Sequence, residues 1–283
     1  MKPSCIDLHI HSTASDGSLS PIEIIETAEK AGLRAISITD HDTVEGSAEA
    51  LRHQHSSGVE ILTGIEVSVG FDSGTMHILG YLIRLDDPSL RQALKDVQKG
   101  RAGRNLQIIK KLQDLGADIS HDEVLKVSGG GQTGRPHIAQ VLVKKGVVQT
   151  IDEAFSKFLK KGRPAYTERY RLLPVEAIQT ILQAGGVPVL AHPFTLNSKT
   201  EGGLDRIVAE LKQAGLKGVE VYYPGHGPDL TAQYERLADR HGLLVTGGTD
   251  FHGMVNPGIH IGIGVGDMRI PYRLVEKLKE AAV

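Results

Sequence analysis

Short runs of β-branched residues alternate along this chain with segments of helical periodicity, and no other feature constrains the fold as strongly. Seven runs have the length and composition of strands: 5–10, 34–39, 60–66, 76–82, 187–191, 218–222 and 243–246. Each is bounded by Gly, Pro or Asp, as strands commonly are. Because helical patterns lie between most of them, the sequence predicts an α/β fold whose mostly parallel sheet closes into a barrel.

The first predicted helix has a clear beginning and end. Ser20 is placed to cap it, Pro21 occupies the first helical position and Glu23 completes a capping box. The apolar periodicity then continues to Gly32, which is typical of a helix end. Further helices are predicted at 45–55, 175–184, 204–214 and 228–241.

The strand pattern stops between residues 88 and 166. A long helix is expected at 90–116, followed by three shorter helical segments around Asp122, Pro136 and Asp152. We therefore interpret the chain as a barrel interrupted by a helical insertion that caps the substrate. The predicted division is a first barrel part at 1–88, the insertion at 89–166 and a second barrel part at 167–283.

Charge is distributed unevenly between these parts. Residues 91–171 contain 17 Lys and Arg but only 8 Asp and Glu, whereas the whole chain has a formal net charge of −2. The remainder of the chain is therefore acidic. A basic segment beside an acidic one suggests that the insertion binds an anionic ligand and that the barrel binds cations.

Composition excludes several classes of protein. With a single cysteine, Cys5, the chain cannot form an internal disulfide, which fits a reducing cytoplasm. The sequence has no apolar run of about 18 residues and no N-terminal signal, so we expect a soluble cytoplasmic protein without a membrane partner. Aromatic residues make up 4% of the chain, with no Trp, which argues against binding along long nucleic acids. Nothing in the sequence predicts a protein partner.

Histidines and carboxylates gather at the predicted strand ends, where barrel enzymes build their active sites. His9 and His11 lie two residues apart in the first strand, so their side chains face the same side and can bind one ion. A single His-x-His is a weak indication, but nearly every strand end supplies a further candidate. The full set of candidate ligands is His9, His11, Asp16, His41, Glu66, His77, His192, Asp250 and His252.

Metal ions explain this convergence. Without them, so many polar groups meeting at one rim would leave unsatisfied donors and acceptors. Imidazole together with carboxylate suits Zn²⁺, Mn²⁺ or Fe²⁺ better than Mg²⁺ or Ca²⁺. Nine ligands exceed the needs of one ion, so we expect two or three divalent ions. The alternative is a binding module in which the metal only stabilises the fold. Such a site would have a closed coordination sphere with no open position for water. Nine ligands beside a basic insertion do not favour this alternative.

The chain resembles a known family through the segments that carry these residues. It is similar to the PHP (polymerase and histidinol phosphatase) family through DLHIHSTASDGSLSP, ITDHDTVEG, GIEVS, HILGY, LAHP and GTDFHG. Metallophosphoesterases of that family fold as distorted seven-stranded β/α barrels, so we expect a distorted (β/α)7 barrel with a helical insertion. All nine of the family's ligand positions are filled by the expected residue types.

The resemblance implies how these ligands are shared. It assigns one ion to His9, His11, Glu66 and Asp250, a second to Glu66, His77 and His192, and a third to Asp16, His41 and His252. Mn²⁺ is the favoured ion, with Fe²⁺ and Zn²⁺ as alternatives. The expected nucleophile is a metal-bound hydroxide that attacks phosphorus in line, rather than a protein side chain.

Two segments of the insertion refine this expectation. GRPHIA at 134–139 and FLKKGRPAY at 158–166 resemble the branch of the family that acts on nucleotide phosphates. That branch includes 3',5'-nucleoside bisphosphate phosphatases and enzymes that trim short oligoribonucleotides from the 5' end. We therefore expect removal of the 3'-phosphate from a substrate such as pAp, and release of 5'-mononucleotides from short RNA. Histidinol-phosphate phosphatase is the alternative function.

Four residues are candidates for contacting the substrate. Arg135 and Arg163 are expected to bind phosphate, because a guanidinium matches its oxygens bidentately, although a surface ion pair is the alternative for each. His137 and His226 are candidates for contacting phosphate or for protonating the leaving oxygen, and His226 is the preferred candidate for the second role. The alternative for each is a supporting role in its loop.

Two further pairs of residues have expected roles near the site, and one other enzyme class is weighed against the sequence. Asp40 and Asp42 flank His41 and are expected to orient it. Tyr222 and Tyr223, at the end of the sixth strand, are candidates for packing against a nucleobase, with packing in the core or at the rim as the default alternative. An amidohydrolase with a binuclear centre would also carry His-x-His, but it needs a bridging lysine at a strand end, and no predicted strand ends in Lys.

Overall fold

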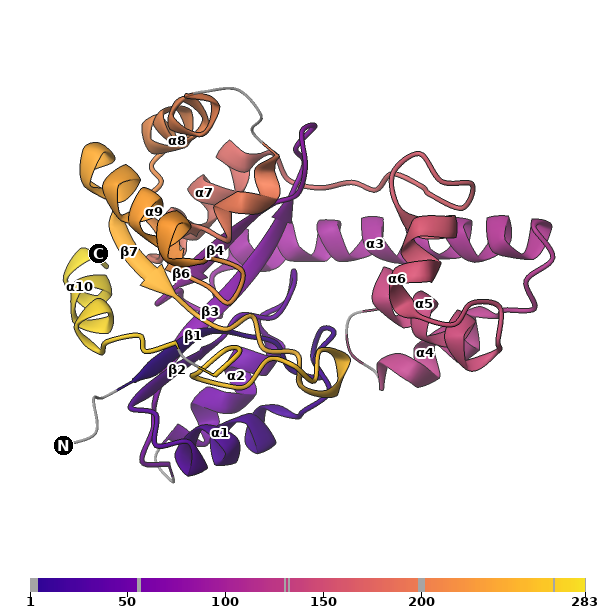
Figure 1. Cartoon of the computed structure of the whole chain (residues 1–283), viewed down its shortest axis with the longest axis horizontal. Helices are drawn as coiled ribbons and strands as arrows, with labels where there is room; N and C mark the ends of the chain where they lie inside the picture. The colour runs from indigo at the N-terminus through magenta and orange to yellow at the C-terminus, as the bar shows by residue number, and fades with distance from the viewer. Residues whose placement is uncertain are drawn as a thin grey trace.

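The computed structural model describes residues 5–54, 57–129, 131, 133–197, 202–266 and 268–282. Seven strands form one sheet in the order of the chain (Figure 1). They are β1 (Ile6–Ile10), β2 (Ala35–Ile38), β3 (Glu60–Val69), β4 (Met76–Tyr81), β5 (Val187–Leu190), β6 (Gly218–Tyr222) and β7 (Leu244–Gly247). All seven predicted strands are therefore present.

The sheet is parallel except at β4, which runs antiparallel to both β3 and β5. The connection from β3 to β4 is too short for a crossover helix, so the two strands form a hairpin. This pairing extends β3 to Val69, beyond the predicted end at Glu66. The two outer strands approach each other where Ile10 bridges to Phe251 and where Thr249 N donates to Asp7 Oδ1 at 2.9 Å. The sheet is thus a nearly closed, distorted barrel.

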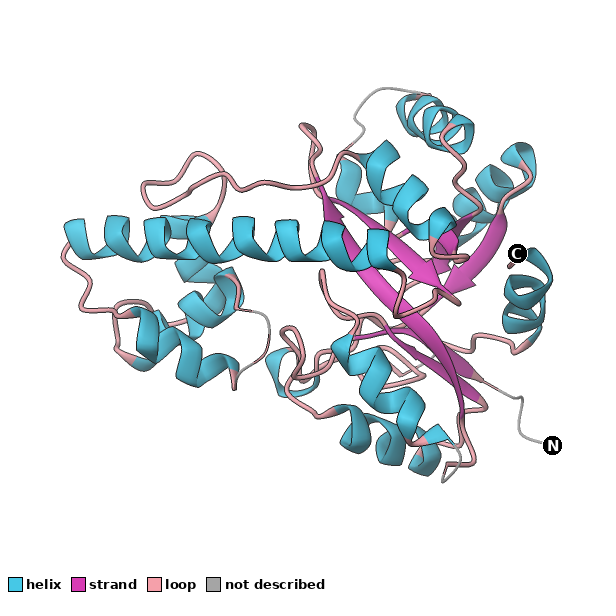
Figure 2. Ribbon diagram, turned by 180° about the vertical axis from the view of Figure 1, so that it is seen from behind, coloured by secondary structure: helices cyan, strands magenta, loops and turns pink. Residues whose placement is uncertain are grey.

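Six helices pack around the outside of the barrel (Figure 2). They are α1 (Pro21–Lys30), α2 (Glu45–Arg52), α7 (Pro174–Gln183), α8 (Gly203–Gln213), α9 (Pro228–His241) and α10 (Arg273–Ala281). The predicted capping box of α1 is confirmed, because Ser20 and Glu23 bond reciprocally. Helix α2 ends before its predicted limit, and residues 55–56 lie outside the described part of the chain. Helix α10 was not predicted; its Leu274, Val275 and Leu278 join the core beside β1.

The segment between β4 and β5 is helical, as predicted. It contains α3 (Pro88–Asp114), α4 (His121–Ser128), α5 (Arg135–Lys144) and α6 (Ile151–Ala154), which continues into a π-helical turn at Phe155–Leu159. Helix α3 extends away from the barrel, and the shorter helices lie against its outer half (Figure 1). They enclose a separate apolar cluster that includes Ile108, Leu112, Ile138 and Leu142. This arrangement supports our division at residues 88 and 166, which stays an interpretation. None of the helices in the described ranges is both long and apolar enough to span a membrane.

Candidate metal centre

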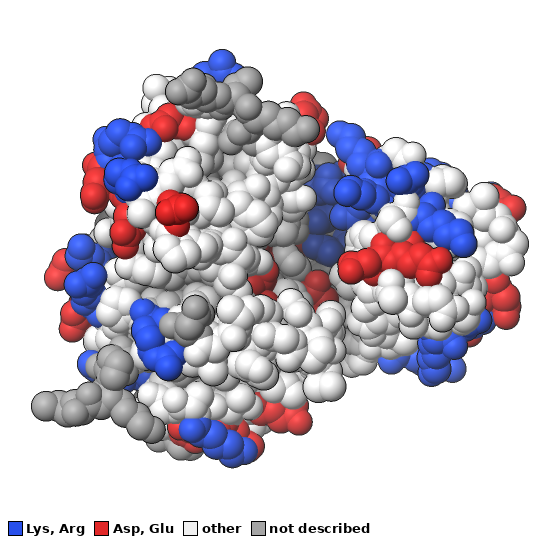
Figure 3. All heavy atoms as spheres, viewed as in Figure 1, with Lys and Arg blue, Asp and Glu red and all other residues white. Residues whose placement is uncertain are grey.

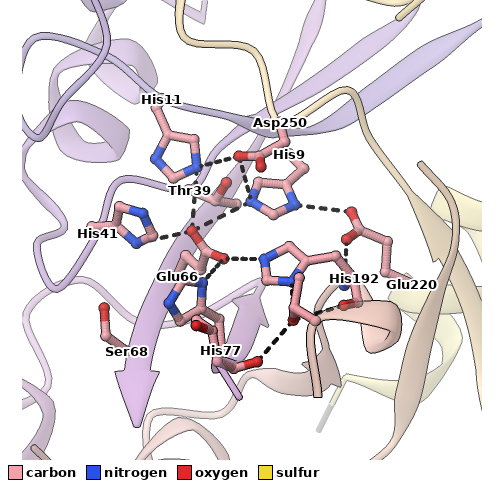
Figure 4. A network of polar contacts seen from close by, with 12 residues as sticks. His9, His11, Thr39, His41, Glu66, Ser68, His77, His192, Glu220 and Asp250 are labelled. Atoms are coloured by element: carbon pink, nitrogen blue, oxygen red, sulfur yellow. Dashed lines mark hydrogen bonds and ion pairs between the residues drawn. The ribbon is translucent and has the colours of Figure 1, made fainter. Parts of the chain in front are cut away.

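The nine predicted ligands meet at the mouth of the barrel. Figure 4 shows how His9, His11, His41, His77, His192 and Asp250 surround the carboxylate of Glu66. Eight of them form three overlapping groups whose ligand atoms lie within 4.8 Å of one another. The groups are His9–His11–Glu66–Asp250, His11–Asp16–His41–His252 and His41–Glu66–His77. The ninth residue, His192, places Nε2 3.0 Å from Glu66 Oε1. The structure therefore brings all nine together, and His11, His41 and Glu66 each belong to two of the three groups.

Strand geometry explains why these side chains converge. His9 lies in β1 and His11 directly follows the strand, and because the two alternate with apolar residues, both point to the mouth. Their Nε2 atoms lie 3.4 and 3.2 Å from Glu66 Oε2, which comes from β3. The same two atoms lie 3.3 and 3.0 Å from Asp250 Oδ1, in the loop after β7. One carboxylate from β3 and one from the loop after β7, far apart in the sequence, thus face both imidazoles.

The unpartnered atoms of this site fit a cation. His9 Nε2, both ring nitrogens of His11, His41 Nδ1 and Glu66 Oε2 are buried and have no hydrogen-bond partner. They nevertheless lie close to one another, as with the 2.9 Å between His41 Nδ1 and Glu66 Oε2. Buried polar atoms without partners are costly, and donor atoms that all face a common centre are what a shared metal ion requires. The mixed imidazole and carboxylate set suits divalent transition metals.

Proton affinities in the site reflect this crowding. Burial by itself would lower the pKa of His11, but the electrostatic attraction of the nearby carboxylates of Asp250 and Glu66 outweighs it and raises the pKa to about 10. Burial is the main cause that lowers the pKa of His77 to about 4, and the positive charges of His41 and His192 lower it further. The negative charge of Glu66 acts in the opposite direction but is outweighed. The carboxyl of Glu66, although buried, has its pKa held well below the usual value by the surrounding imidazoles. A proton on His11 must leave before that nitrogen can bind a metal.

Glu220 is a supporting residue that the sequence analysis missed. Its Oε1 accepts a hydrogen bond from His9 Nδ1 at 2.9 Å, and its Oε2 accepts one from His192 N at 2.8 Å. The carboxylate is fully buried in β6, the strand to which we had assigned no metal-binding residue. It fixes the His9 tautomer so that Nε2 is free to bind a metal. A lone acid within the apolar strand GVEVY is the signal that could have identified it.

Asp40 and Asp42, which we expected to orient His41, use their side chains for other hydrogen bonds. The side chain of Asp40 accepts hydrogen bonds from Ser12 N and Ser15 Oγ at 2.7 and 2.6 Å, which shapes the loop that carries Asp16. The side chain of Asp42 accepts from Ser68 N at 2.8 Å. They position His41 through the backbone instead, because Glu66 N donates to Asp40 O at 3.2 Å and Asp42 N donates to Glu66 O at 2.9 Å.

The four candidate substrate residues occupy different environments. Arg135 is part-buried and donates to Leu159 O at 3.2 Å, whereas Arg163 is exposed. His137 is buried, accepts a hydrogen bond from Gly134 N at 3.1 Å, and is influenced by the charges of nearby Asp16 and Arg101.

His226 is buried behind an aromatic wall formed by Phe194, Tyr223 and Tyr234. Its Nδ1 lies 2.8 Å from Val221 O, so Nδ1 carries the proton, and the buried Nε2 has no partner. Burial lowers the pKa of His226, which keeps the ring neutral. In this tautomer Nε2 carries no proton and can only accept a hydrogen bond, so the geometry does not favour a role as proton donor.

A cavity of about 520 Å³ opens beside the candidate ligands Asp16, Asp250 and His252. Its walls include Phe194 and Tyr223 from the barrel and Phe155 from the insertion. The Tyr223 hydroxyl donates to Asp250 Oδ2 at 2.9 Å, which holds the ring at the edge of the site. Figure 3 shows the surface hollowed between barrel and insertion, with Lys and Arg along one side. The mouth of the barrel is therefore accessible to a ligand with both apolar and anionic parts.

A sequence profile of the PHP domain matches residues 7–255. The chain belongs to the PHP domain family. A 3',5'-nucleoside bisphosphate phosphatase from Chromobacterium violaceum is 34% identical, over 91% of this chain and 90% of that protein. A 5'-3' exoribonuclease from Haemophilus influenzae is 32% identical, over 87% of this chain and 89% of that protein. These relatives belong to the branch that the insertion motifs predict.

Solved structures of PHP-like proteins share the fold. A structure described as an amidohydrolase from Chromobacterium violaceum, with bound sulfate, has a TM-score of 0.86 at 32% identity and covers 99% of this chain and 98% of its own. A protein from Bifidobacterium adolescentis described as a metal-dependent phosphoesterase also has a TM-score of 0.86, at 29% identity, and covers 100% and 98%. The predicted family and barrel fold are confirmed. None of the seven described strands ends in the lysine expected of a binuclear amidohydrolase.

Replacing a shared ligand should remove metal and activity together. We expect His11→Ala and Asp250→Ala to lose most bound metal and at least about 100-fold in phosphoesterase rate, because each faces several other ligands. Metal content by mass spectrometry and hydrolysis rates measure both effects. His241→Ala, which removes an imidazole paired with Asp205 away from the site, is the control. Full metal content with lost activity would contradict the assignment of His11 as a ligand.

Glu220→Gln tests the support of His9 without removing a ligand. The amide keeps the size of the side chain but loses the negative charge of the carboxylate that accepts the hydrogen bond from His9 Nδ1. We expect metal affinity to fall by about 10- to 100-fold while the fold is retained. Competition with a metal-binding dye measures the affinity, and the exposed Glu276→Gln is the matched control. Equal affinities in the two variants would show that Glu220 does not support the site.

Proposed function

We propose that this chain is a metal-dependent phosphoesterase that removes the 3'-phosphate from nucleoside 3',5'-bisphosphates and converts pAp to AMP and phosphate. The observation that carries the proposal is the set of nine converging ligands beside a cavity with aromatic walls and a basic side. The Chromobacterium violaceum relative, named for this activity, supports it. We further propose that Mn²⁺ is the favoured ion, with Fe²⁺ and Zn²⁺ as alternatives, and that the protein works in the cytoplasm.

The nine candidate ligands would hold two or three divalent ions, which supply Lewis-acid polarisation of the phosphoryl oxygens and activate water for in-line attack. The chain's own residues prepare this site. Glu220 orients His9, and Tyr223 hydrogen-bonds Asp250 so that one carboxylate oxygen, Oδ1, remains directed at the imidazoles. The aromatic walls exclude water from one side of the cavity, which strengthens electrostatic interactions within it.

The cavity suits a nucleoside between the metal centre and the insertion. Phe155, Phe194 and Tyr223 present aromatic faces and edges on which a base can stack. His226 Nε2, a buried acceptor behind this wall, suits a hydroxyl donor. Arg135 and Arg163 stay candidates for phosphate contact, and so does His137, which lies two residues after Arg135 in the first turn of α5.

A second activity is favoured by the Haemophilus influenzae relative, which is named as a 5'-3' exoribonuclease. We propose that the same site releases 5'-mononucleotides from short oligoribonucleotides. The two reactions share their chemistry, because each breaks the bond between phosphorus and the 3'-oxygen of a nucleotide that carries a 5'-phosphate. They differ only in whether the departing phosphoryl group bears a further nucleoside.

A panel of three substrates tests the proposal. Mn²⁺-loaded protein is incubated with pAp, histidinol phosphate and a 5'-phosphorylated RNA dinucleotide, and the products are separated by chromatography. We expect AMP and inorganic phosphate from pAp, mononucleotides from the dinucleotide, and no product from histidinol phosphate. Turnover of histidinol phosphate alone would overturn the assignment of a nucleotide substrate, but the assignment of the metal ligands would remain supported.

A further inference from the structure

Three arginines are buried where α3 meets the segment that returns to the barrel. Arg101 and Arg104 on α3 are 9% and 4% exposed, and the side chain of Arg169 is 4% exposed. Arginine is rarely buried to this degree unless its charge is paired. These residues form what we call the arginine cluster, defined as Arg101, Arg104 and Arg169.

The arginine cluster carries more positive charge than its surroundings neutralise. Asp42 contacts both Arg101 and Arg169, the latter at 3.1 Å. Within the described ranges, no carboxylate contacts Arg104. Burial, together with the charges of Arg101, Arg135 and other arginines nearby, lowers the pKa of Arg104 to about 8. Asp42 thus pairs with two of the three guanidinium groups, and the third, on Arg104, has no carboxylate partner in the described part of the chain.

Each arginine of the cluster also has a buried nitrogen without a hydrogen-bond partner. These atoms are Arg101 Nε, Arg104 Nε and Arg169 Nη1. A buried donor without an acceptor is costly, and three in one place are unusual in a folded protein. A phosphate group offers several acceptor oxygens and a compensating charge, and it matches guanidinium geometry.

The arginine cluster adjoins the metal centre. Asp42 directly follows the candidate ligand His41, and the buried His137 is influenced by both Asp16 and Arg101. Arg101 also lies against Gly134, at the N-terminus of α5, where the helix dipole adds positive charge. A cavity of about 440 Å³ reaches the cluster at Arg101. An anion held there would lie where α3 faces Asp42, next to the loop that carries His41.

We propose that the arginine cluster binds the phosphate group of the substrate that is not hydrolysed, and that Asp42 positions Arg101 and Arg169 for it. This inference rests on the proposed function, in which that group is the 5'-phosphate of a nucleoside 3',5'-bisphosphate or of an RNA end. The cluster then selects nucleotides with a terminal 5'-phosphate. It also sets the direction of RNA trimming, because an internal nucleotide has no terminal phosphate to place there.

Arg104→Met tests the proposal by removing the unpaired charge while keeping the length of the side chain. Calorimetry on Mn²⁺-loaded protein compares the binding of AMP with that of adenosine. We expect the preference of the wild type for AMP to fall by about 10- to 100-fold, the loss of one charge-assisted hydrogen bond. Arg206→Met, an exposed residue on α8, should retain the preference. An unchanged preference in Arg104→Met would overturn the proposal.

Thermal unfolding separates this role from a structural one. Removing an unpaired buried charge should raise the melting temperature of Arg104→Met above that of the wild type. AMP should then stabilise the wild type more than the variant. A lower melting temperature together with equal stabilisation by AMP would identify Arg104 as structural and contradict the proposal.

The failure of this inference can be told from failure of the proposed function. If the wild type prefers AMP to adenosine through Arg104 but leaves pAp intact, the phosphate site stands and the proposed reaction is wrong. If pAp is hydrolysed and the kcat/KM ratio of pAp to adenosine 3'-monophosphate is the same in wild type and Arg104→Met, the reaction stands and the arginine cluster has no part in it.

Discussion

The structure of this protein depends on one buried carboxylate, Glu66, held among imidazoles at the mouth of the barrel. Removing a carboxylate from water is unfavourable unless positive or hydrogen-bonding groups surround it. Here its oxygens lie 2.7 to 3.4 Å from ring nitrogens of His9, His11, His41, His77 and His192. These imidazoles come from four strands or the loops that follow them. The centre can therefore exist only when the barrel has assembled.

The backbone shows strain where ligands are presented. Three non-glycine residues in or beside the centre, Asp42, His192 and Asp250, adopt positive φ angles of 56°, 25° and 52°. Such conformations persist where the surrounding structure enforces them, and they often mark functional sites. Close packing adds a further constraint, because a Cβ on Gly248 would lie 2.3 Å from the backbone nitrogen of His9. The loop after β7 thus approaches β1 closely enough to bring Asp250 to the ligands.

The strands and the nine ligands could be predicted because their signals are local. Each strand is a short run with its own boundaries, and each ligand lies near a strand end, where a barrel gathers side chains. Glu220 was missed because a single acid in β6 has no neighbour of similar chemistry. The arginine cluster was missed for a different reason. Arg101 and Arg169 lie 59 and 127 residues from Asp42 in sequence, so only the tertiary structure shows that they share one carboxylate.

The most direct test of the account is a crystal structure of the Mn²⁺-loaded protein with anomalous scattering data collected at the manganese edge. The account predicts two or three manganese peaks at the mouth of the barrel, with Glu66 contacting more than one of them. It also predicts His192 among the ligands, although that residue lies outside the three compact groups. A single peak away from Glu66, or none at the barrel mouth, would contradict the central claim that this carboxylate organises a multi-metal centre.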